Sequence, residues 1–164
     1  MLIGVISDSH DNLPKIDAAV AKLNSLNVSR VLHAGDYCSP FAALRYLNLK
    51  ARMIGVFGNN DAEKEILKTK FESFGHDVGG RFSSVELEGA RIALLHGDEP
   101  NLLHEIVRTQ AYDLVVSGHT HSIDQKRTGR TISFNPGEIC GYLSGRATIA
   151  TFETSTHRIE IFDI

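Results

Sequence analysis

The sequence has few of the features that mark secreted, membrane or nucleic-acid-binding proteins. Its two cysteines, Cys38 and Cys140, are too few for a disulfide framework, and their spacing fits neither a Cys-x-x-Cys redox pair nor a zinc finger. It contains no apolar run long enough to cross a membrane and no polybasic run, and its formal net charge is −3. We therefore expect a globular protein of a reducing cytoplasm that does not bind nucleic acid or membranes strongly.

The length of the chain, 164 residues, predicts a single domain spanning residues 1–164. The amino-terminal third predicts strands that alternate with helices. Its first apolar run has no polar alternation, which is typical of a parallel strand buried on both faces. In order, the predicted elements are a strand at 2–6, a helix from Leu13 to about Leu26, a strand at 30–33, a short helix at 41–47, a strand at 51–57 and a surface helix at 62–71 with Asp61 as its N-cap.

The rest of the chain is richer in strands. It predicts a hairpin of 83–87 and 91–95, a helix at 101–110, and further strands at 114–117, 123–126, 131–134, 147–152 and 158–162. Parallel units followed by a strand-rich half indicate an α/β domain. Periodicity alone leaves two architectures open, which are one mixed sheet and two packed sheets flanked by helices.

Polar residues follow the predicted strands at their carboxyl ends. In α/β sheets the loops at this edge converge on a crevice where ligands bind. We expect seven side chains to meet there and to hold metal ions: Asp8, His10, Asp36, Asn59, His96, His119 and His121.

These side chains offer carboxylate, amide and imidazole donors without a thiolate. Such a set suits Mn²⁺, Ni²⁺, Co²⁺, Fe²⁺ or Zn²⁺ and disfavours a structural zinc site. Seven ligands are too many for one tetrahedral ion. Two divalent ions about 3.5–4 Å apart, bridged by one carboxylate, would use them all, as in two-metal hydrolysis of phosphoesters. Asp36 is the natural bridge, and Mn²⁺ is the first choice of metal.

The same residues form five motifs in a fixed order. They are Asp8-x-His10, Gly35-Asp36, Gly58-Asn59-Asn60-Asp61, His96-Gly97 and Gly118-His119-Thr120-His121. In this order they resemble the calcineurin-like metallophosphoesterase superfamily. With Asn135-Pro136-Gly137 near the end, the chain resembles the small, single-domain bacterial and archaeal phosphodiesterase branch over nearly its whole length.

The resemblance implies a four-layer α/β/β/α sandwich with two mixed β-sheets flanked by helices. It also implies a division of the ligands: Asp8, His10 and His121 for one ion, Asn59, His96 and His119 for the other, and Asp36 for both. A hydroxide bridging the two metals would attack the phosphorus atom of a small phosphodiester in line. No nucleophile from the protein is then needed.

The chain departs from the superfamily pattern at two positions. Many members have a histidine after the metal-binding asparagine, whereas this chain has Asn60, and an amide cannot act as a general acid. We therefore expect activated diesters to be better substrates than monoesters, and count Asp36, Asn59 and Asn60 as the residues that take part in catalysis. Asp98 replaces a second histidine of close relatives; we expect it to cap a helix or to be solvated, the alternative being a contact that orients a histidine ligand.

Other histidines and the cysteines have simpler interpretations. His33 is expected to be a hydrogen-bonded core residue, and Cys38 and Cys140 small buried groups. Asn135-Pro136-Gly137 predicts a turn that holds the sheet and could border the pocket. Three histidines outside the motifs are expected to be solvated: His76, His104 and His157.

Two other functions are compatible with the same fold. Relatives that have lost metal ligands act as scaffolds for protein partners, but this chain keeps every ligand. A phosphomonoesterase, a nuclease or a cyclic-nucleotide phosphodiesterase would use the same metal site. Dispersed lysine and arginine residues argue against a nucleic-acid groove. The expected partner is a small phosphoester, and the sequence is compatible with a homo-oligomer.

Overall fold

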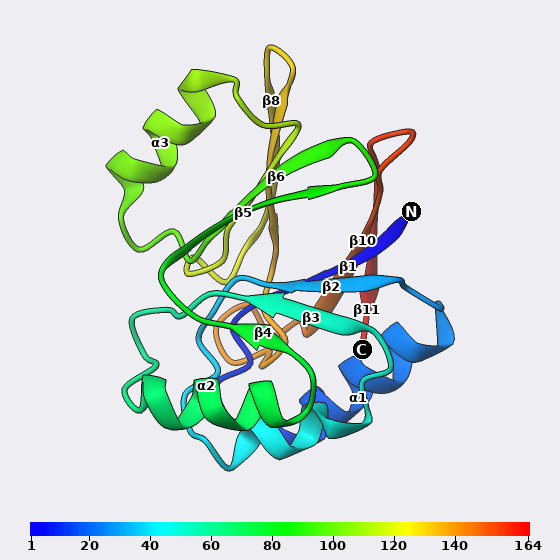
Figure 1. Cartoon of the computed structure of the whole chain (residues 1–164), viewed down its shortest axis with the longest axis vertical. Helices are drawn as coiled ribbons and strands as arrows, with labels where there is room; N and C mark the ends of the chain where they lie inside the picture. Colours follow the sequence, from blue (N-terminus) through cyan, green and yellow to red (C-terminus); the bar gives the residue numbers. More distant parts are fainter.

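Two mixed β-sheets pack face to face, with helices on both outer sides (Figure 1). The computed structural model describes every residue from 1 to 164. The elements are β1 (Leu2–Ile6), α1 (Leu13–Ser25), β2 (Arg30–His33), the 3₁₀ helix η1 (Ala42–Asn48), β3 (Arg52–Gly55), α2 (Lys64–Ser73), β4 (Asp77–Val78), β5 (Phe82–Leu87), β6 (Ala90–Leu95), α3 (Pro100–Thr109), β7 (Leu114–Val116), β8 (Ile123–Thr128), β9 (Thr131–Pro136), β10 (Thr148–Glu153) and β11 (Arg158–Asp163). None of the helices combines the length and the apolar character that a membrane crossing requires.

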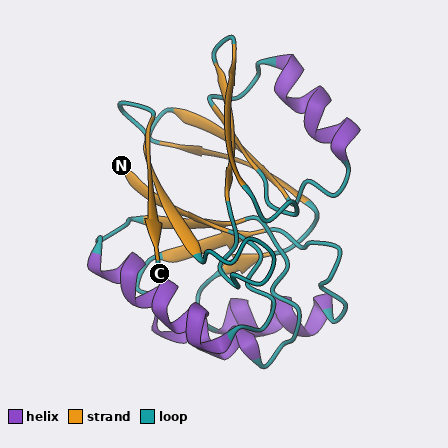
Figure 2. Ribbon diagram, turned by 180° about the vertical axis from the view of Figure 1, so that it is seen from behind, coloured by secondary structure: helices purple, strands orange, loops and turns teal.

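Each sheet combines parallel and antiparallel strands. The first sheet has the strand order β11-β10-β1-β2-β3-β4, in which β1 to β4 are parallel. The second has the order β5-β6-β7-β9-β8, in which β6, β7 and β9 are parallel. The parallel strands of each sheet therefore end at a common edge, where several connecting loops lie close together (Figure 2).

Alternating side chains of β1 enter two different cores, as strand geometry requires. Ile3 and Val5 are buried between the sheets in one cluster with Ile92 and Leu94 of β6. Ile6 instead belongs to the cluster beneath α1, η1 and α2. A run that is apolar on both faces therefore forms the middle of the sandwich.

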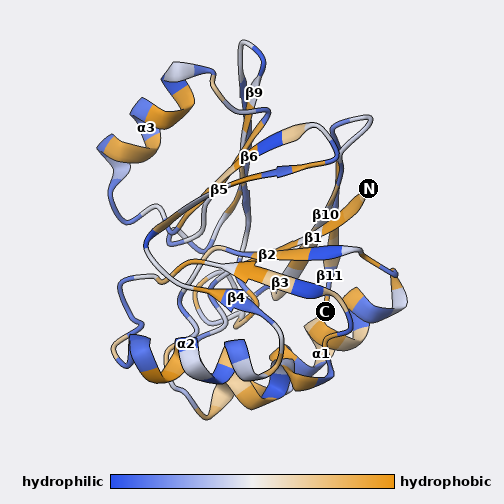
Figure 3. Ribbon diagram, viewed as in Figure 1, coloured by the Kyte–Doolittle hydropathy of each residue, from blue (hydrophilic) through white to orange (hydrophobic).

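The helices cover the outer faces of the two sheets. α1, η1 and α2 lie against the first sheet, whereas α3 lies alone beside the second (Figures 1 and 2). α3 packs Leu103, Ile106 and Val107 against Ala93 and Leu95 of β6. Each helix carries hydrophobic and hydrophilic residues, as Figure 3 shows, which suits one buried face. The four layers confirm the predicted α/β/β/α sandwich and the choice of two sheets.

Three local predictions were wrong. β4 was missed because two residues are too few to show a period. α2 begins at Lys64 with Glu63 as its N-cap, whereas Asp61 is buried and bonded elsewhere. His76 is buried, not solvated: its Nδ1 accepts a hydrogen bond from Met53 N–H (3.3 Å), and its Nε2 lies 3.2 Å from the Tyr46 carbonyl oxygen.

Candidate metal centre

The seven predicted ligands converge at the shared edge of the two sheets. Asp8 and His10 follow β1, Asp36 follows β2 and Asn59 follows β3, all in the first sheet. The second sheet contributes the other three: His96 directly after β6, and His119 and His121 after β7. Each sheet thus supplies part of one cluster.

The backbone at most of these positions is strained. Five of the seven residues adopt positive φ angles, which side-chain-bearing residues rarely do: Asp8 (54°), His10 (39°), Asp36 (61°), His119 (67°) and His121 (58°). Such conformations persist only where the surrounding structure enforces them, and they concentrate at functional sites. The turns direct the side chains into the cluster at a cost to backbone stability.

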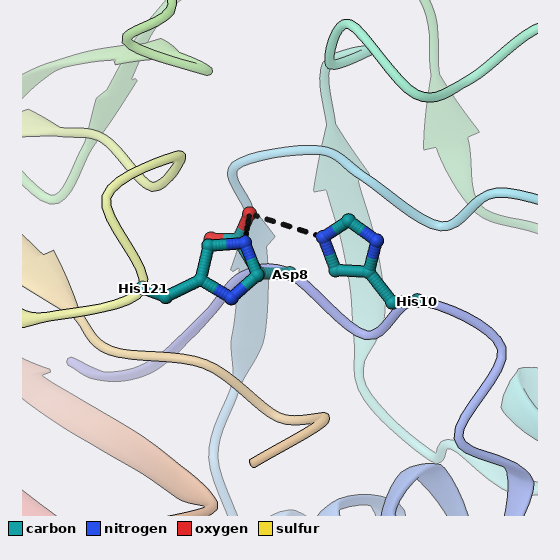
Figure 4. Close-up of side chains that lie close together, drawn as sticks. All are labelled: Asp8, His10 and His121. Carbon is teal, nitrogen blue, oxygen red and sulfur yellow. Dashed lines mark ion pairs between the residues drawn. The ribbon is translucent and has the colours of Figure 1, made fainter. Parts of the chain in front are cut away.

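One group of side chains consists of Asp8, His10 and His121 (Figure 4). The Nε2 atoms of His10 and His121 lie 3.7 and 3.5 Å from Oδ1 of Asp8. The two imidazole rings stack with their centroids 4.9 Å apart. Asp8 Oδ1 and His10 Nε2 are buried and have no hydrogen-bond partner, an arrangement that a metal ion would satisfy.

A second group surrounds Asn59. Its Oδ1 lies 3.0 Å from His96 Nε2 and 3.1 Å from His119 Nδ1. His96 Nε2 is also 3.3 Å from Oδ2 of Asp36. The same Asp36 oxygen lies 3.3 Å from Nε2 of His10, so this carboxylate stands between the two groups.

The cluster carries strong mutual electrostatic effects. The Asp36 and Asp8 carboxylates, with Cys38, raise the pKa of His10 to about 12. Burial raises the pKa of Asp36, but the His10 and His96 imidazoles lower it by more. The pKa of this carboxyl therefore lies well below its usual range. Burial lowers the pKa of His96, but Asp36 more than offsets this effect. These carboxylates create a negative field that attracts cations, and the donor set fits divalent metals.

Three histidines are anchored through the ring nitrogen that faces away from the cluster. Nδ1 of His96 lies 2.8 Å from the carbonyl oxygen of Ala34 and Nδ1 of His10 lies 3.3 Å from Cys38 Sγ. Nδ1 of His121 lies 2.6 Å from Glu138 Oε2. Such bonds orient metal-binding imidazoles and leave Nε2 directed at the centre.

Asn60 contacts Asp36 through both its backbone and its side chain. Its N–H donates to Asp36 Oδ1 (2.9 Å) and its Nδ2 donates to Asp36 Oδ2 (2.8 Å). Its amide therefore holds the carboxylate that joins the two groups. Asp98 caps no helix, since Glu99 is the N-cap of α3, and pairs with Arg81 at 2.6 Å. It makes no hydrogen bond to a histidine.

Two buried carboxylates that were not predicted to support the site do so: Asp61, which was expected to cap a helix, and Glu138. Asp61 accepts hydrogen bonds from the N–H groups of Asp36 (3.0 Å), Cys38 (2.8 Å) and Gly58 (2.7 Å), and so joins two of the site loops. Glu138 accepts a hydrogen bond from His121. Burial raises the pKa of Glu138, but hydrogen bonds from Cys140, His121 and Ser144 lower it by more, to about 2. Only its place directly after Asn135-Pro136-Gly137 could have drawn attention to Glu138.

Most of the remaining predictions agree with the structure, but the turn predicted at Asn135-Pro136-Gly137 was wrong for its first two residues, which lie in β9 and pair with β8. His33 is a buried, hydrogen-bonded core residue, and Cys140 is buried while Cys38 is partly buried, both as free thiols. His104 is exposed and His157 is partly exposed. Asn135 lies in β9 and donates through Nδ2 to the Gly118 carbonyl oxygen (2.7 Å), which ties the end of the sheet to the His119 loop.

The chain is similar to known phosphoesterases over nearly its whole length. The calcineurin-like phosphoesterase superfamily domain matches residues 1–157. Phosphodiesterase MJ0936 of Methanocaldococcus jannaschii is 37% identical over 155 residues, which cover 94% of this chain and 93% of that protein. A Methanothermobacter thermautotrophicus protein named "Probable metallophosphoesterase" is 32% identical, with 84% of this chain and 76% of that protein covered.

A solved structure described as a novel archaeal phosphodiesterase has the same fold. It superposes with a TM-score of 0.96 at 34% identity, and the match covers all of both chains. These similarities confirm the resemblance carried by the five motifs, and the chain belongs to the calcineurin-like phosphoesterase superfamily.

Proposed function

We propose that the chain is a phosphodiesterase that holds two divalent metal ions in this cluster and hydrolyses small phosphodiesters. The observation that carries the proposal is the position of Asp36 between the two groups, with Nε2 of His10 and Nε2 of His96 both 3.3 Å from its Oδ2. The similarity to two archaeal phosphodiesterases supports the choice of reaction.

The ligands divide into two sets under this proposal. Asp8, His10 and His121 hold one ion; Asn59, His96 and His119 hold the other; and Asp36 binds both. When bound, two such ions lower the pKa of a water molecule and stabilise charge on phosphate oxygens in an in-line displacement. Mn²⁺ is the proposed metal, and Ni²⁺, Co²⁺, Fe²⁺ and Zn²⁺ suit the same donors.

The protein's own contribution is to fix these ligands before substrate arrives. Asn59 bridges His96 and His119 through its amide oxygen. Asn60 acts on the reaction through Asp36, because its side-chain amide is already bonded to that carboxylate. Position 60 has no imidazole that could protonate a leaving group. Substrates whose leaving group is stable as an anion should therefore react best.

Small substrates fit the surroundings of the cluster better than nucleic acid. Arg81 borders a cavity beside His96 and pairs with Asp98. Arg146 borders a cavity beside His121 and pairs with Asp163. They do not form the continuous basic groove that a nucleic-acid backbone requires. The scaffold alternative is not favoured, because all the predicted ligands are kept and converge.

The proposal is tested with metal-free protein to which single divalent metals are returned. We expect two ions per chain, activity that depends on them, and faster hydrolysis of bis(p-nitrophenyl) phosphate than of p-nitrophenyl phosphate. Elemental analysis gives the stoichiometry, and nitrophenolate absorbance gives the rates. One ion per chain at saturation would contradict the paired centre, and equal or faster monoester hydrolysis would contradict the substrate class.

A further inference from the structure

Glu138 is a fully buried carboxylate that accepts hydrogen bonds on both oxygens. Oε2 accepts from His121 Nδ1 (2.6 Å) and from Cys140 Sγ (2.8 Å). Oε1 accepts from the Ser144 N–H (2.6 Å), the Ser144 hydroxyl (2.7 Å) and the Leu143 N–H (3.0 Å). Oε2 also accepts from the Tyr142 N–H (3.2 Å), so this carboxylate connects a histidine of the metal centre to the loop of residues 142–144.

No lysine or arginine neutralises this carboxylate. His121 is the one ionisable base within ion-pair distance, and the two nearest arginines along the chain, Arg130 and Arg146, pair with Asp113 and Asp163. A buried anion of this kind is retained only where its surroundings supply enough donors. The donors around Glu138 are the His121 ring, a thiol and the backbone of residues 142–144.

The bond to His121 selects one tautomer of the ring. A carboxylate is an acceptor only, so Nδ1 carries the proton and Nε2 keeps its lone pair. Nε2 lies 3.5 Å from Oδ1 of Asp8, on the side of the cluster where that oxygen has no hydrogen-bond partner. Glu138 thus directs the lone pair of His121 toward the place where a metal ion would bind.

The other oxygen fixes the loop that borders the same place. Ser144 and Arg146 line a cavity of about 280 Å³ together with His121. Tyr142 and Leu143, which precede them, are exposed by 62% and 75%, and their N–H groups donate to Glu138. The hydrogen bonds of Glu138 therefore determine where this rim lies relative to His121.

We propose that Glu138 is a positioning residue with two functions: it holds His121 in the Nδ1–H tautomer for metal binding, and it fixes residues 142–144 at the substrate side of the same site. The proposal rests on the proposed function, in which His121 is a metal ligand. Neither function requires Glu138 to touch the metal or the substrate.

Glu138→Gln tests the first function with little change in size. In the Oε1 position the amide NH₂ would face the close N–H groups of Leu143 and Ser144, whereas in the Oε2 position it would face only the more distant Tyr142 N–H (3.2 Å). We therefore expect the NH₂ to turn toward His121, whose Nδ1 must then accept the hydrogen bond. That moves the ring proton to Nε2 and removes the lone pair from the metal. In calorimetric titration with Mn²⁺, we expect the affinity of one of the two sites to fall about 10–100-fold while the other is unchanged.

Asp113→Asn is the matched control, because Asp113 is a buried carboxylate that pairs with Arg130 before β7, at the opposite end of that strand from the site. It should bind both ions as the wild type does. Glu138→Gln with two sites of wild-type affinity would overturn the proposal, and so would equal weakening of both sites. Wild-type protein that binds no second ion would instead contradict the proposed function.

A measurement on the unmodified protein covers the case in which Glu138→Gln does not fold. In ¹⁵N-histidine-labelled, metal-free wild-type protein at mildly alkaline pH, two-bond couplings report which nitrogen carries the proton, and His121→Gln assigns the signal. A proton on Nδ1 of His121 supports the proposal. A proton on Nε2 alone overturns it.

The second function is read from steady-state kinetics. Ser144→Ala removes the hydroxyl donor to Glu138 Oε1 and leaves the His121 bond in place. We expect it to raise the KM for bis(p-nitrophenyl) phosphate while Mn²⁺ affinity stays at the wild-type value. An unchanged KM would refute the second function, in which Glu138 fixes residues 142–144 at the substrate side of the site.

Discussion

Acid should destabilise the metal-free protein through His33, the buried histidine that ends β2. Its Nδ1 accepts a hydrogen bond from the N–H of Gly35 (3.1 Å), and its Nε2 lies 3.1 Å from the hydroxyl of Tyr46. A protonated ring would place an N–H group against the Gly35 N–H, so the folded state requires the neutral form. Burial, reinforced by the nearby His96, lowers the pKa of His33 from 6.5 to about 3.

The sign of the effect follows from this shift. Because the pKa is lower in the folded than in the unfolded chain, the unfolded chain binds the proton first as the pH falls. The stability contributed by neutral His33 is complete above pH 6.5 and is lost progressively as the pH falls toward about 3. At pH 5 the unfolded ring is protonated about thirtyfold over its neutral form, which corresponds to a loss of about 2 kcal/mol.

Urea unfolding in the presence of a chelator, repeated from pH 8 to about pH 4.5, measures this loss. His33→Gln keeps a polar side chain that does not titrate. Below pH 6 the free energy of unfolding of this variant should fall less steeply than that of the wild type, and the two slopes should differ by about 1.4 kcal/mol per pH unit. Burial also lowers the pKa of His76, but this residue is present in both proteins, so its contribution cancels in the comparison. The exposed His104→Gln should behave as the wild type does. A His33→Gln variant as acid-sensitive as the wild type would refute the reasoning.

Three further predictions concern the cluster. Asp36→Ala should lower kcat at least about a thousandfold and reduce bound metal in elemental analysis, because both groups lose their common carboxylate; turnover near the wild-type rate would contradict the assignment. Asn60→Ala should weaken Mn²⁺ binding about 10–100-fold in calorimetry, since it removes the 2.8 Å bond to Asp36 Oδ2. Gly58→Ala would place a Cβ 2.1 Å from Asp36 Oδ1 and should cost about 1–3 kcal/mol in urea unfolding. Gly79→Ala, whose nearest neighbour would be 3.9 Å away, is its control, and equal stabilities would refute the clash.

The sequence predicted best what depends on local patterns. The apolar runs at 2–6 and 30–33 coincide with β1 and β2, because strands buried on both faces leave a continuous apolar signal. The motif residues also meet as expected, since carboxyl ends of parallel strands share one edge. The resemblance to a known family supplied the four-layer arrangement, which periodicity had left open.

Predictions from local patterns were wrong where contacts between residues distant in the sequence decide the structure. Asp61 was interpreted as an N-cap because it precedes a helical pattern, but its partners Asp36 and Cys38 lie on another loop, 25 and 23 residues away. His76 follows α2 in what was expected to be an exposed turn, yet the carbonyl oxygen of Tyr46 and the N–H of Met53 enclose it. Burial of a polar residue is decided by what packs over it, and a single sequence does not record that.

The division of the ligands between the two sheets has a consequence for stability. Under the proposed assignment each ion takes ligands from both layers: Asp8 and His10 with His121 for one, and Asn59 with His96 and His119 for the other. Ions bound in this way cross-link the two sheets in addition to the apolar packing and the hydrogen bonds between them. A ligand that binds only the folded state stabilises it in proportion to the logarithm of its concentration over Kd. Metal should therefore raise the midpoint of unfolding of both sheets together, because neither sheet can separate from the other without releasing an ion.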